Sequence, residues 1–345
     1  MHTRFGSSLR FMTRSLLFAG AALVATLASS RPAAAQPVLI KLGTLAPKGS
    51  TWETLLKQMG QDWAKVSNNQ VTLRIYAGGT LGNESDMVKK MRIGQLQAAA
   101  LTSIGLHDIS PDPQAIDVPM MMESPAMLDY VRERIAAQLE KSIDTKGFVV
   151  LDWSEVGFVR FFSTKKFDTV KALQDGAKVF CWEGDPASAD AWRAAGFKPV
   201  IMSSTDIVPS LQTGLLDTVA LSPLYAFTSQ IFQKAKYMLD TPWASLTGAM
   251  VVRKDAWEKI PADVRVKLLA IAKDTGKKID AEVRRMDAEA LRSMQAEGLT
   301  VIKGDPAALL VAAKASWKVI RGRVVPEAMF DQVQKLAAEA KALKK

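Results

Sequence analysis

Few residues in this sequence have the types and spacing that catalysis requires. The chain of 345 residues has two histidines, of which only His107 lies beyond the first 35 residues, and one cysteine, Cys181. A lone histidine in a turn-rich segment is more often a surface residue than a catalytic base. Cys181 stands between Phe180 and Trp182, which favours a small pocket-wall residue over a reactive thiol. Because HExxH, CxxC, GxSxG and GxxxxGK motifs are absent, an enzyme is the least favoured function, and we expect neither a cofactor nor a metal.

Acidic and methionine side chains give no stronger signal. Asp152, Glu155 and Glu183 stand near the ends of expected strands, but none has a partner at a spacing typical of paired catalytic carboxylates. We therefore interpret them as solvated loop acids. Residues 120–122 are three methionines after Pro119. Three consecutive residues of an extended segment cannot all face one ion, so core packing is favoured over a soft-metal site.

Aromatic side chains around one arginine are more informative. Six aromatic residues fall in expected strands or crossings: Trp153, Phe158, Phe161, Phe162, Phe180 and Trp182. Arg160 is the one cation among them. Ordinary sheet core explains at least half of these residues. The sharper alternative is an apolar pocket with Phe180 and Trp182 as walls. In that pocket Arg160 anchors a carboxylate, because its planar guanidinium can bind one bidentately.

The segment 171–223 must position part of this cluster. It alternates strands and helices: strand 178–182, helix 187–195 ending at Gly196, strand 198–202, a helix from Thr205 or Asp206 to Gln212, and strand 219–221. Such alternation is typical of a parallel sheet with crossover helices, whose ligands bind at the carboxyl ends of the strands. The residues that follow Trp182 and Leu221 are therefore candidates for ligand binding.

The rest of the chain predicts a second α/β unit. The expected elements are strands 38–42, 71–76, 97–101 and 149–153, a helix capped by Ser50 or Thr51, a helix over 83–91, a long helix over 263–297, and helices from Pro306 onwards. Residues 157–163 are expected to cross between the units, and residues 246–253 to return. Two α/β lobes joined by several crossings predict a cleft that closes on a ligand.

The first 35 residues have the composition of a secretory signal peptide. Arg4, Arg10 and Arg14 form a basic region, residues 16–28 are apolar, and Ala33 to Ala35 offer a cleavage site. The apolar run is about 13 residues, whereas a membrane span needs roughly 20. We therefore expect the mature protein to begin near Gln36 and to be localised in the periplasm.

Composition then excludes other classes. Without the first 35 residues the chain has 41 Lys and Arg against 35 Asp and Glu, a net charge of +6. This mild basicity is spread along the chain, which argues against nucleic acid as a partner. A single cysteine excludes an intramolecular disulfide, so stability must come from packing.

Several motifs together resemble one known family. They are Leu-Gly-Asn-Glu at 81–84, Asp-Val-Pro at 117–119, Gly-Phe-Val-Arg at 157–160, Asp-Gly-Ala-Lys at 175–178 and Leu-Gln-Thr-Gly-Leu-Leu-Asp at 211–217. In this order and spacing they resemble the DctP-type solute receptors of tripartite ATP-independent periplasmic (TRAP) transporters, over nearly the whole mature chain. The resemblance implies an α/β, two-lobed periplasmic binding protein-like fold. It has hinge strands, a central ligand cleft and a long lobe-spanning helix.

The lobes are expected to interleave in sequence. Lobe I comprises residues 36–157 plus about 246–285, and lobe II comprises residues 158–245 plus about 286–345. The resemblance also implies partners, namely a small organic solute and the TRAP membrane permease subunits. We expect the receptor to be a monomer.

The resemblance implies a modified ligand site. Two arginines usually grip the substrate carboxylate in this family; the first matches Arg160, and the position of the second is Phe180. Other family pocket positions correspond to Thr102 and Gly105, to Leu221 or Ser222, and to Gly248. Our expected ligand-binding residues are Arg160, Phe180, Trp182, Thr102, Ser222, Leu45 and Gly248. The pocket has thus exchanged charged contacts for apolar and aromatic surface.

The leading hypothesis is a periplasmic receptor for a monocarboxylate or a largely apolar organic solute. If Glu155 or Asp152 pairs with Arg160 instead of the ligand, the ligand is free to be neutral, because a buried arginine needs one anionic partner. The alternative is a periplasmic carrier of a hydrophobic compound, or a sensor input module, on the same fold.

Overall fold

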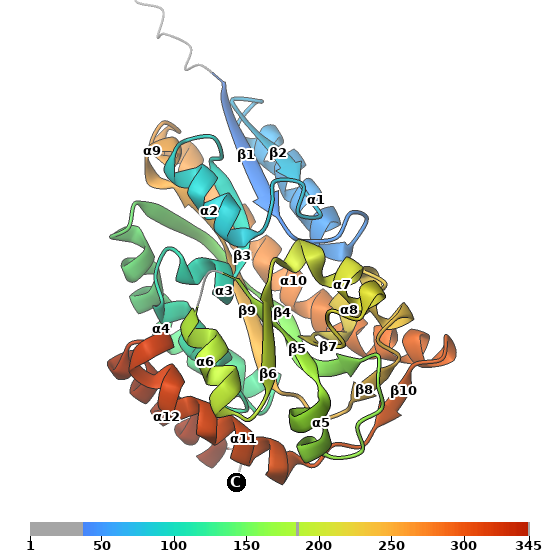
Figure 1. Ribbon diagram of the computed structural model, residues 1–345. Helices are drawn as coiled ribbons and strands as arrows, with labels where there is room; N and C mark the ends of the chain where they lie inside the picture. The colour runs from blue at the N-terminus through green and yellow to red at the C-terminus, as the bar shows by residue number, and fades with distance from the viewer. Residues whose placement is uncertain (1–36, 184–185, 344–345) are drawn as a thin grey trace, which may run out of the picture. The chain divides into compact units, whose positions relative to one another are not determined.

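The computed structural model describes residues 37–183 and 186–343 (Figure 1). The expected signal peptide, residues 1–35, lies outside the described residues. Among the helices described, none is long and apolar enough to cross a membrane.

The N-terminal elements alternate as expected. They are β1 (Val38–Thr44), α1 (Thr51–Val66), β2 (Val71–Tyr76), α2 (Glu84–Arg92), β3 (Ala98–Thr102), α3 (Ser103–His107), the 3-10 helix η1 (Asp112–Asp117) and α4 (Pro125–Asp144). Ser50 caps α1 by accepting from the backbone N–H of Glu53, and Asn83 forms a capping box with Asp86 at the start of α2. β1 pairs in parallel with both β2 and β3.

Two long strands cross the middle of the sheet. β4 (Phe148–Ser163) joins the two expected strands 149–153 and 157–163 into one element, and β9 (Ala244–Arg253) runs antiparallel to it. Their register shifts between Val150 and Asp152 and again between Glu155 and Gly157, where Gly157 has a φ of +115°. β9 also pairs with β3, and the end of β4 pairs with β7, so the expected crossings are confirmed.

The second parallel group follows β4. Its elements are α5 (Val170–Gly176), β5 (Lys178–Trp182), α6 (Pro186–Ala194), β6 (Lys198–Met202), η2 (Ser204–Asp206), α7 (Ile207–Thr213), β7 (Thr218–Leu221), α8 (Pro223–Thr228), η3 (Ile231–Gln233) and β8 (Tyr237–Leu239). β5 pairs in parallel with β6 and β7. The main strand order is β2-β1-β3-β9-β4-β7-β5-β6, so the antiparallel pair β9-β4 lies between two parallel groups.

The C-terminal elements cover both groups. They are α9 (Lys254–Trp257), α10 (Ala262–Ala296), β10 (Thr300–Ile302), α11 (Pro306–Val319), η4 (Ile320–Val324) and α12 (Glu327–Ala342). α10, orange in Figure 1, packs against α1, β4 and α8, and α11 packs against α6. A Cβ at Gly276 of α10 would lie 2.8 Å from the carbonyl oxygen of Trp153, so glycine permits this close helix–strand approach. The mixed α/β fold with its long helix is as expected.

Candidate ligand-binding site

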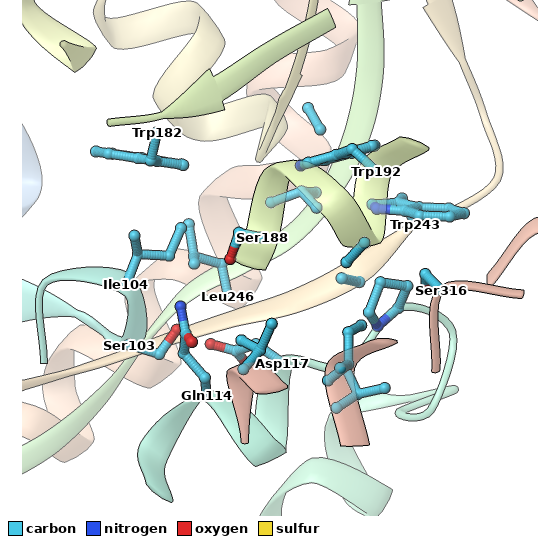
Figure 2. A pocket seen from close by; sticks show the side chains of 18 of the residues that line it. Ser103, Ile104, Gln114, Asp117, Trp182, Ser188, Trp192, Trp243, Leu246 and Ser316 are labelled. Carbon is cyan, nitrogen blue, oxygen red and sulfur yellow. The ribbon is translucent and has the colours of Figure 1, made fainter. Parts of the chain in front are cut away.

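An aromatic-lined cavity of about 150 Å³ lies beside the carboxyl end of β5, and we name it the tryptophan cavity (Figure 2). Its walls come from α3, η1, β4, β5, α6, β7, the start of β9, α11 and η4. The side chains that line it include Ser103, Gln114, Asp117, Val159, Phe180, Cys181, Trp182, Trp192, Trp243 and Leu246. Because these elements come from both halves of the sheet, closing or opening of the lobes would change the cavity.

Tryptophan side chains form one end of the cavity. Trp192 of α6 stacks on Trp243, with ring centroids 5.5 Å apart and an interplanar angle of 21°. The backbone N–H of Trp243 donates to the carbonyl of Val159 at 2.8 Å, and its carbonyl accepts from the N–H of Met120 at 2.7 Å, so the backbone that carries this ring is held on both sides. Trp182 makes an edge contact with Phe180 at 5.2 Å. Aromatic rings packed in this way offer a rigid apolar surface.

Oxygen atoms gather at the other end. Figure 2 shows the side chains of Ser103, Gln114 and Asp117 directed toward one another at the floor of the cavity. Asp117 Oδ2 accepts from the backbone N–H of Thr247 at 2.9 Å and from its hydroxyl at 3.1 Å. Asp117 Oδ1, Gln114 Oε1 and Ser103 Oγ are buried and have no hydrogen-bond partner among the described residues. Buried polar atoms without partners are costly and mark places where a ligand can bind.

Asp117 is the charged group of this cavity. Burial raises the pKa of its carboxyl to about 6, against the opposing effects of the Ser103 hydroxyl, which lies close to the carboxyl but outside hydrogen-bond geometry, and of the hydrogen bonds from Thr247. At neutral pH the carboxyl is therefore mainly ionised. Of the described residues that line the cavity, none is lysine, arginine or histidine. The tryptophan cavity thus has an anionic, oxygen-rich floor and an apolar roof.

Arg160 does not line this cavity. Its neighbour Val159 does, and successive residues of a strand point to opposite faces of the sheet. The Nε of Arg160 donates to the carbonyl of Asp240 at 2.9 Å, and its Nη1 lies 3.5 Å from the Asp287 carboxylate of α10. The protein acid that pairs with Arg160 is therefore Asp287. The expectation that Glu155 or Asp152 pairs with Arg160 was wrong.

Those two acids are instead buried in the protein. Asp152 is 4% exposed and accepts from the backbone N–H of Met250 at 3.0 Å, while Glu155 is 2% exposed and pairs with Arg284 of α10. Burial raises the pKa of both carboxyls. The interpretation as solvated loop acids was thus wrong for both residues. It fits Glu183, which is exposed and accepts a hydrogen bond from the Asn83 amide.

Three expected site residues line a second, smaller cavity of about 80 Å³, the Glu84 cavity. These are Leu45, Thr102 and Gly248. Glu84 accepts from the N–H and the hydroxyl of Thr102, both at 2.7 Å, and burial raises its pKa to about 7. Tyr225 also lines this cavity, and burial raises its pKa to about 12. Because Thr102 and Ser103 are consecutive, the end of β3 borders both cavities.

The remaining expected residues have clear positions. Phe180 and Trp182 line the tryptophan cavity, as does the buried Cys181. Ser222 lines neither cavity; its hydroxyl caps α8 by accepting from the N–H of Tyr225. Met121 and Met122 pack in the core against α4 and α12. In the described part of the chain, no group of three or more His, Cys, Asp or Glu side chains is placed to hold a metal ion.

Four residues of the tryptophan cavity were missed from the sequence. Asp117 belongs to one of the sequence motifs, whereas Gln114, Trp192 and Trp243 belong to none of the expected sites. Trp192 and Trp243 are 51 positions apart in the printed sequence and meet only through the fold. The one available signal is an acid two residues before a proline in an apolar segment.

Comparison with known proteins places the chain in a family. Residues 42–322 match the family model of bacterial extracellular solute-binding proteins, family 7, called DctP. The C4-dicarboxylate-binding periplasmic protein DctP of Rhodobacter capsulatus is 25% identical over 322 residues, covering 90% of this chain and 92% of that protein. A solute-binding protein of Roseobacter denitrificans is 24% identical over 314 residues, covering 89% and 94%.

Solved structures share the fold. A TRAP periplasmic solute-binding protein from Pseudomonas putida F1, with bound D-glucuronate, has a TM-score of 0.79 and 22% identity, and the match covers 89% of this chain and 98% of that one. Another from Ralstonia eutropha H16, with bound (S)-2-acetolactate, has a TM-score of 0.80 and 20% identity, covering 87% and 99%. The fold is therefore that of a two-lobed periplasmic binding protein. By the family match over most of its length, the chain belongs to the DctP family of bacterial extracellular solute-binding proteins.

Proposed function

We propose that this protein is the periplasmic receptor of a TRAP transporter. It binds a small organic solute in the tryptophan cavity by closure of the two lobes and delivers the solute to membrane permease subunits. The observation that carries the proposal is the cavity itself. It is lined from both parallel groups of the sheet and combines an apolar roof with buried, unpartnered oxygen atoms.

The solute is largely apolar and differs from the acids bound in the solved relatives. Neither Val159 nor Phe180 can bind a carboxylate, and Arg160 is already paired with Asp287. A buried carboxylate ligand without a cation would be strongly disfavoured. A monocarboxylate solute would therefore have no cationic anchor in this cavity, whereas a largely apolar solute would still contact its aromatic walls.

Lobe closure follows from the two crossing strands. We propose the lobes expected from the sequence, residues 36–157 with about 246–285 and residues 158–245 with about 286–345. The hinge lies in β4 and β9 near Gly157, where the register shifts. Asn83, at the start of α2, donates to Glu183, just after β5, so this hydrogen bond joins the two lobes. It would favour the closed state.

Native mass spectrometry of the protein purified from the periplasm tests the proposal. We expect one small organic molecule to be retained by the wild type and lost from Trp243→Ala, which removes a wall of the cavity. A dicarboxylate or an acidic sugar retained in its place would contradict the apolar assignment. Genes for two membrane subunits beside this gene would support transport; their absence would favour the carrier or sensor alternative. Size-exclusion chromatography is expected to show a monomer.

A further inference from the structure

We propose that the solute carries a protonated amine, which donates hydrogen bonds to Asp117 and Gln114 while its apolar body lies against the tryptophans. This inference rests on the proposed receptor function and names the chemical class of its solute. It follows from three features of the tryptophan cavity: the balance of donors and acceptors at its floor, its charge, and its aromatic walls.

The floor presents acceptor atoms that the described residues leave without a donor. Asp117 Oδ1 and Gln114 Oε1 are acceptors, and Ser103 Oγ carries one hydrogen; all three are buried and unpartnered among the described residues. The Ser103 hydroxyl can donate to only one of the two acceptors. The other acceptor is therefore open to a donor from the solute. A hydroxyl group supplies a single hydrogen, whereas a primary ammonium supplies three and can serve both Asp117 and Gln114.

Charge selects the same group. Asp117 has no lysine, arginine or histidine among the described residues that line its cavity. Thr247 stabilises one carboxylate oxygen through two hydrogen bonds and leaves the other directed to the floor. An ammonium would complete an ion pair in a poorly solvated site, where hydrogen bonds between charged groups are strongest. A carboxylate solute would instead face like charge.

The walls suit an organic cation with a ring. The tryptophan cavity, of about 150 Å³, matches the volume of engineered apolar cavities that bind benzene. The faces of aromatic rings attract cations, and tryptophan does so most strongly. Trp192 and Trp243 are held as a stacked pair, so they need little ordering on binding. A phenyl or similar ring with a short aminoalkyl chain fits both ends of the cavity.

A matched series of three compounds tests the inference. 2-Phenylethylamine, 2-phenylethanol and 3-phenylpropionate share a ring and differ in charge, being positive, neutral and negative at neutral pH. Their binding to the full mature protein, freed of any retained solute by unfolding and refolding, is measured by isothermal titration calorimetry. We expect the amine to bind tightest and the acid weakest, with at least about a tenfold difference between them.

Two variants locate the charge. Asp117→Asn keeps the shape of the side chain and an oxygen for Thr247, and we expect it to weaken amine binding at least about tenfold while changing alcohol binding by less than about threefold. Glu84→Gln makes the same chemical change in the Glu84 cavity and should leave the affinity for all three compounds unchanged. Thermal unfolding confirms that both variants fold.

Each remaining outcome overturns the inference. If the acid binds tightest, the inference is wrong but the receptor function stands. The same conclusion follows if Asp117→Asn does not change amine binding, or if Glu84→Gln abolishes it. Failure of the amine to bind at about 10 mM would exclude the amine class. Failure of the receptor function is seen separately, when native mass spectrometry and a broad solute library give no bound molecule.

Discussion

Replacing Glu84 with glutamine should change how the stability of this protein depends on pH. Glu84 is 3% exposed and accepts two hydrogen bonds from Thr102. Burial raises its pKa from 4.5 to about 7, against the opposing effect of those hydrogen bonds. The folded state therefore holds a proton on Glu84 in a pH range where the unfolded chain has released it.

The sign and size of the effect follow from this difference. Where the folded state binds more protons than the unfolded state, the free energy of unfolding falls as pH rises. The contribution of Glu84 is complete below pH 4.5 and is lost as pH rises through about 7. Each pKa unit corresponds to about 1.36 kcal/mol, so the change is about 3 kcal/mol.

The variant removes this term alone. Glutamine is neutral at every pH; its oxygen can accept from the N–H of Thr102, and the Thr102 hydroxyl can turn to accept from its amide. Asp117 and Asp152 titrate in both proteins, so their effects cancel in the comparison. From about pH 4.5 to about pH 7.5, the stability of Glu84→Gln relative to the wild type should rise by about 3 kcal/mol.

Urea denaturation at about pH 4.5, 6 and 7.5 measures this difference. Glu133→Gln is the control, because Glu133 is exposed on α4 and its replacement makes the same chemical change at the surface. Parallel pH profiles for the wild type and Glu84→Gln would refute the reasoning, since they would mean that Glu84 has the same pKa in the folded and unfolded states.

Three further predictions concern the elements around the site. Arg160→Ala should lower the free energy of unfolding by about 1–3 kcal/mol, because it leaves the partly buried Asp287 carboxylate unpaired. It should change solute affinity less than about twofold. A complete loss of affinity would show that Arg160 anchors the solute. Gly248→Ala should destabilise the fold by about 2 kcal/mol or more in urea denaturation, because the new Cβ would lie 2.4 Å from the carbonyl oxygen of Leu101. Unchanged stability would show that β3 and β9 separate easily. Glu183→Ala removes the hydrogen-bond acceptor of Asn83 and should weaken solute binding about two- to tenfold in calorimetry. If the variant and the wild type bind the solute with equal affinity, this hydrogen bond has no role in lobe closure.

Much of the fold could be predicted from local sequence patterns. Periodicity and capping residues predicted strands 71–76, 178–182 and 198–202 with the bounds that the structure has. These short elements are bounded by glycine, proline or polar residues that act locally. The long helix α10 was also predicted to within one residue at each end.

The orientation of Arg160 could not be predicted in the same way. Alternation along a strand fixes the face of each side chain only if the strand is regular, and β4 has two register shifts before this residue. Its pairing with Asp287 of α10 depends on a contact between residues 127 positions apart in the printed sequence.

The floor of the cavity was missed for a related reason. Asp117 and Gln114 belong to a 3-10 helix whose composition resembles an ordinary turn. They become significant only where β9 brings Thr247 to one oxygen of Asp117 and leaves the other unpartnered. A hydrogen-bonding deficit of this kind is a property of the folded chain and has no local sequence signal.

A crystal structure of the protein with its retained solute, or with 2-phenylethylamine, tests the central claim most directly. We predict that the ligand ring contacts Trp192 and Trp243 and that its nitrogen lies within about 3 Å of Asp117 Oδ1. A ligand bound in the Glu84 cavity, or with a carboxylate on Arg160, would contradict the account.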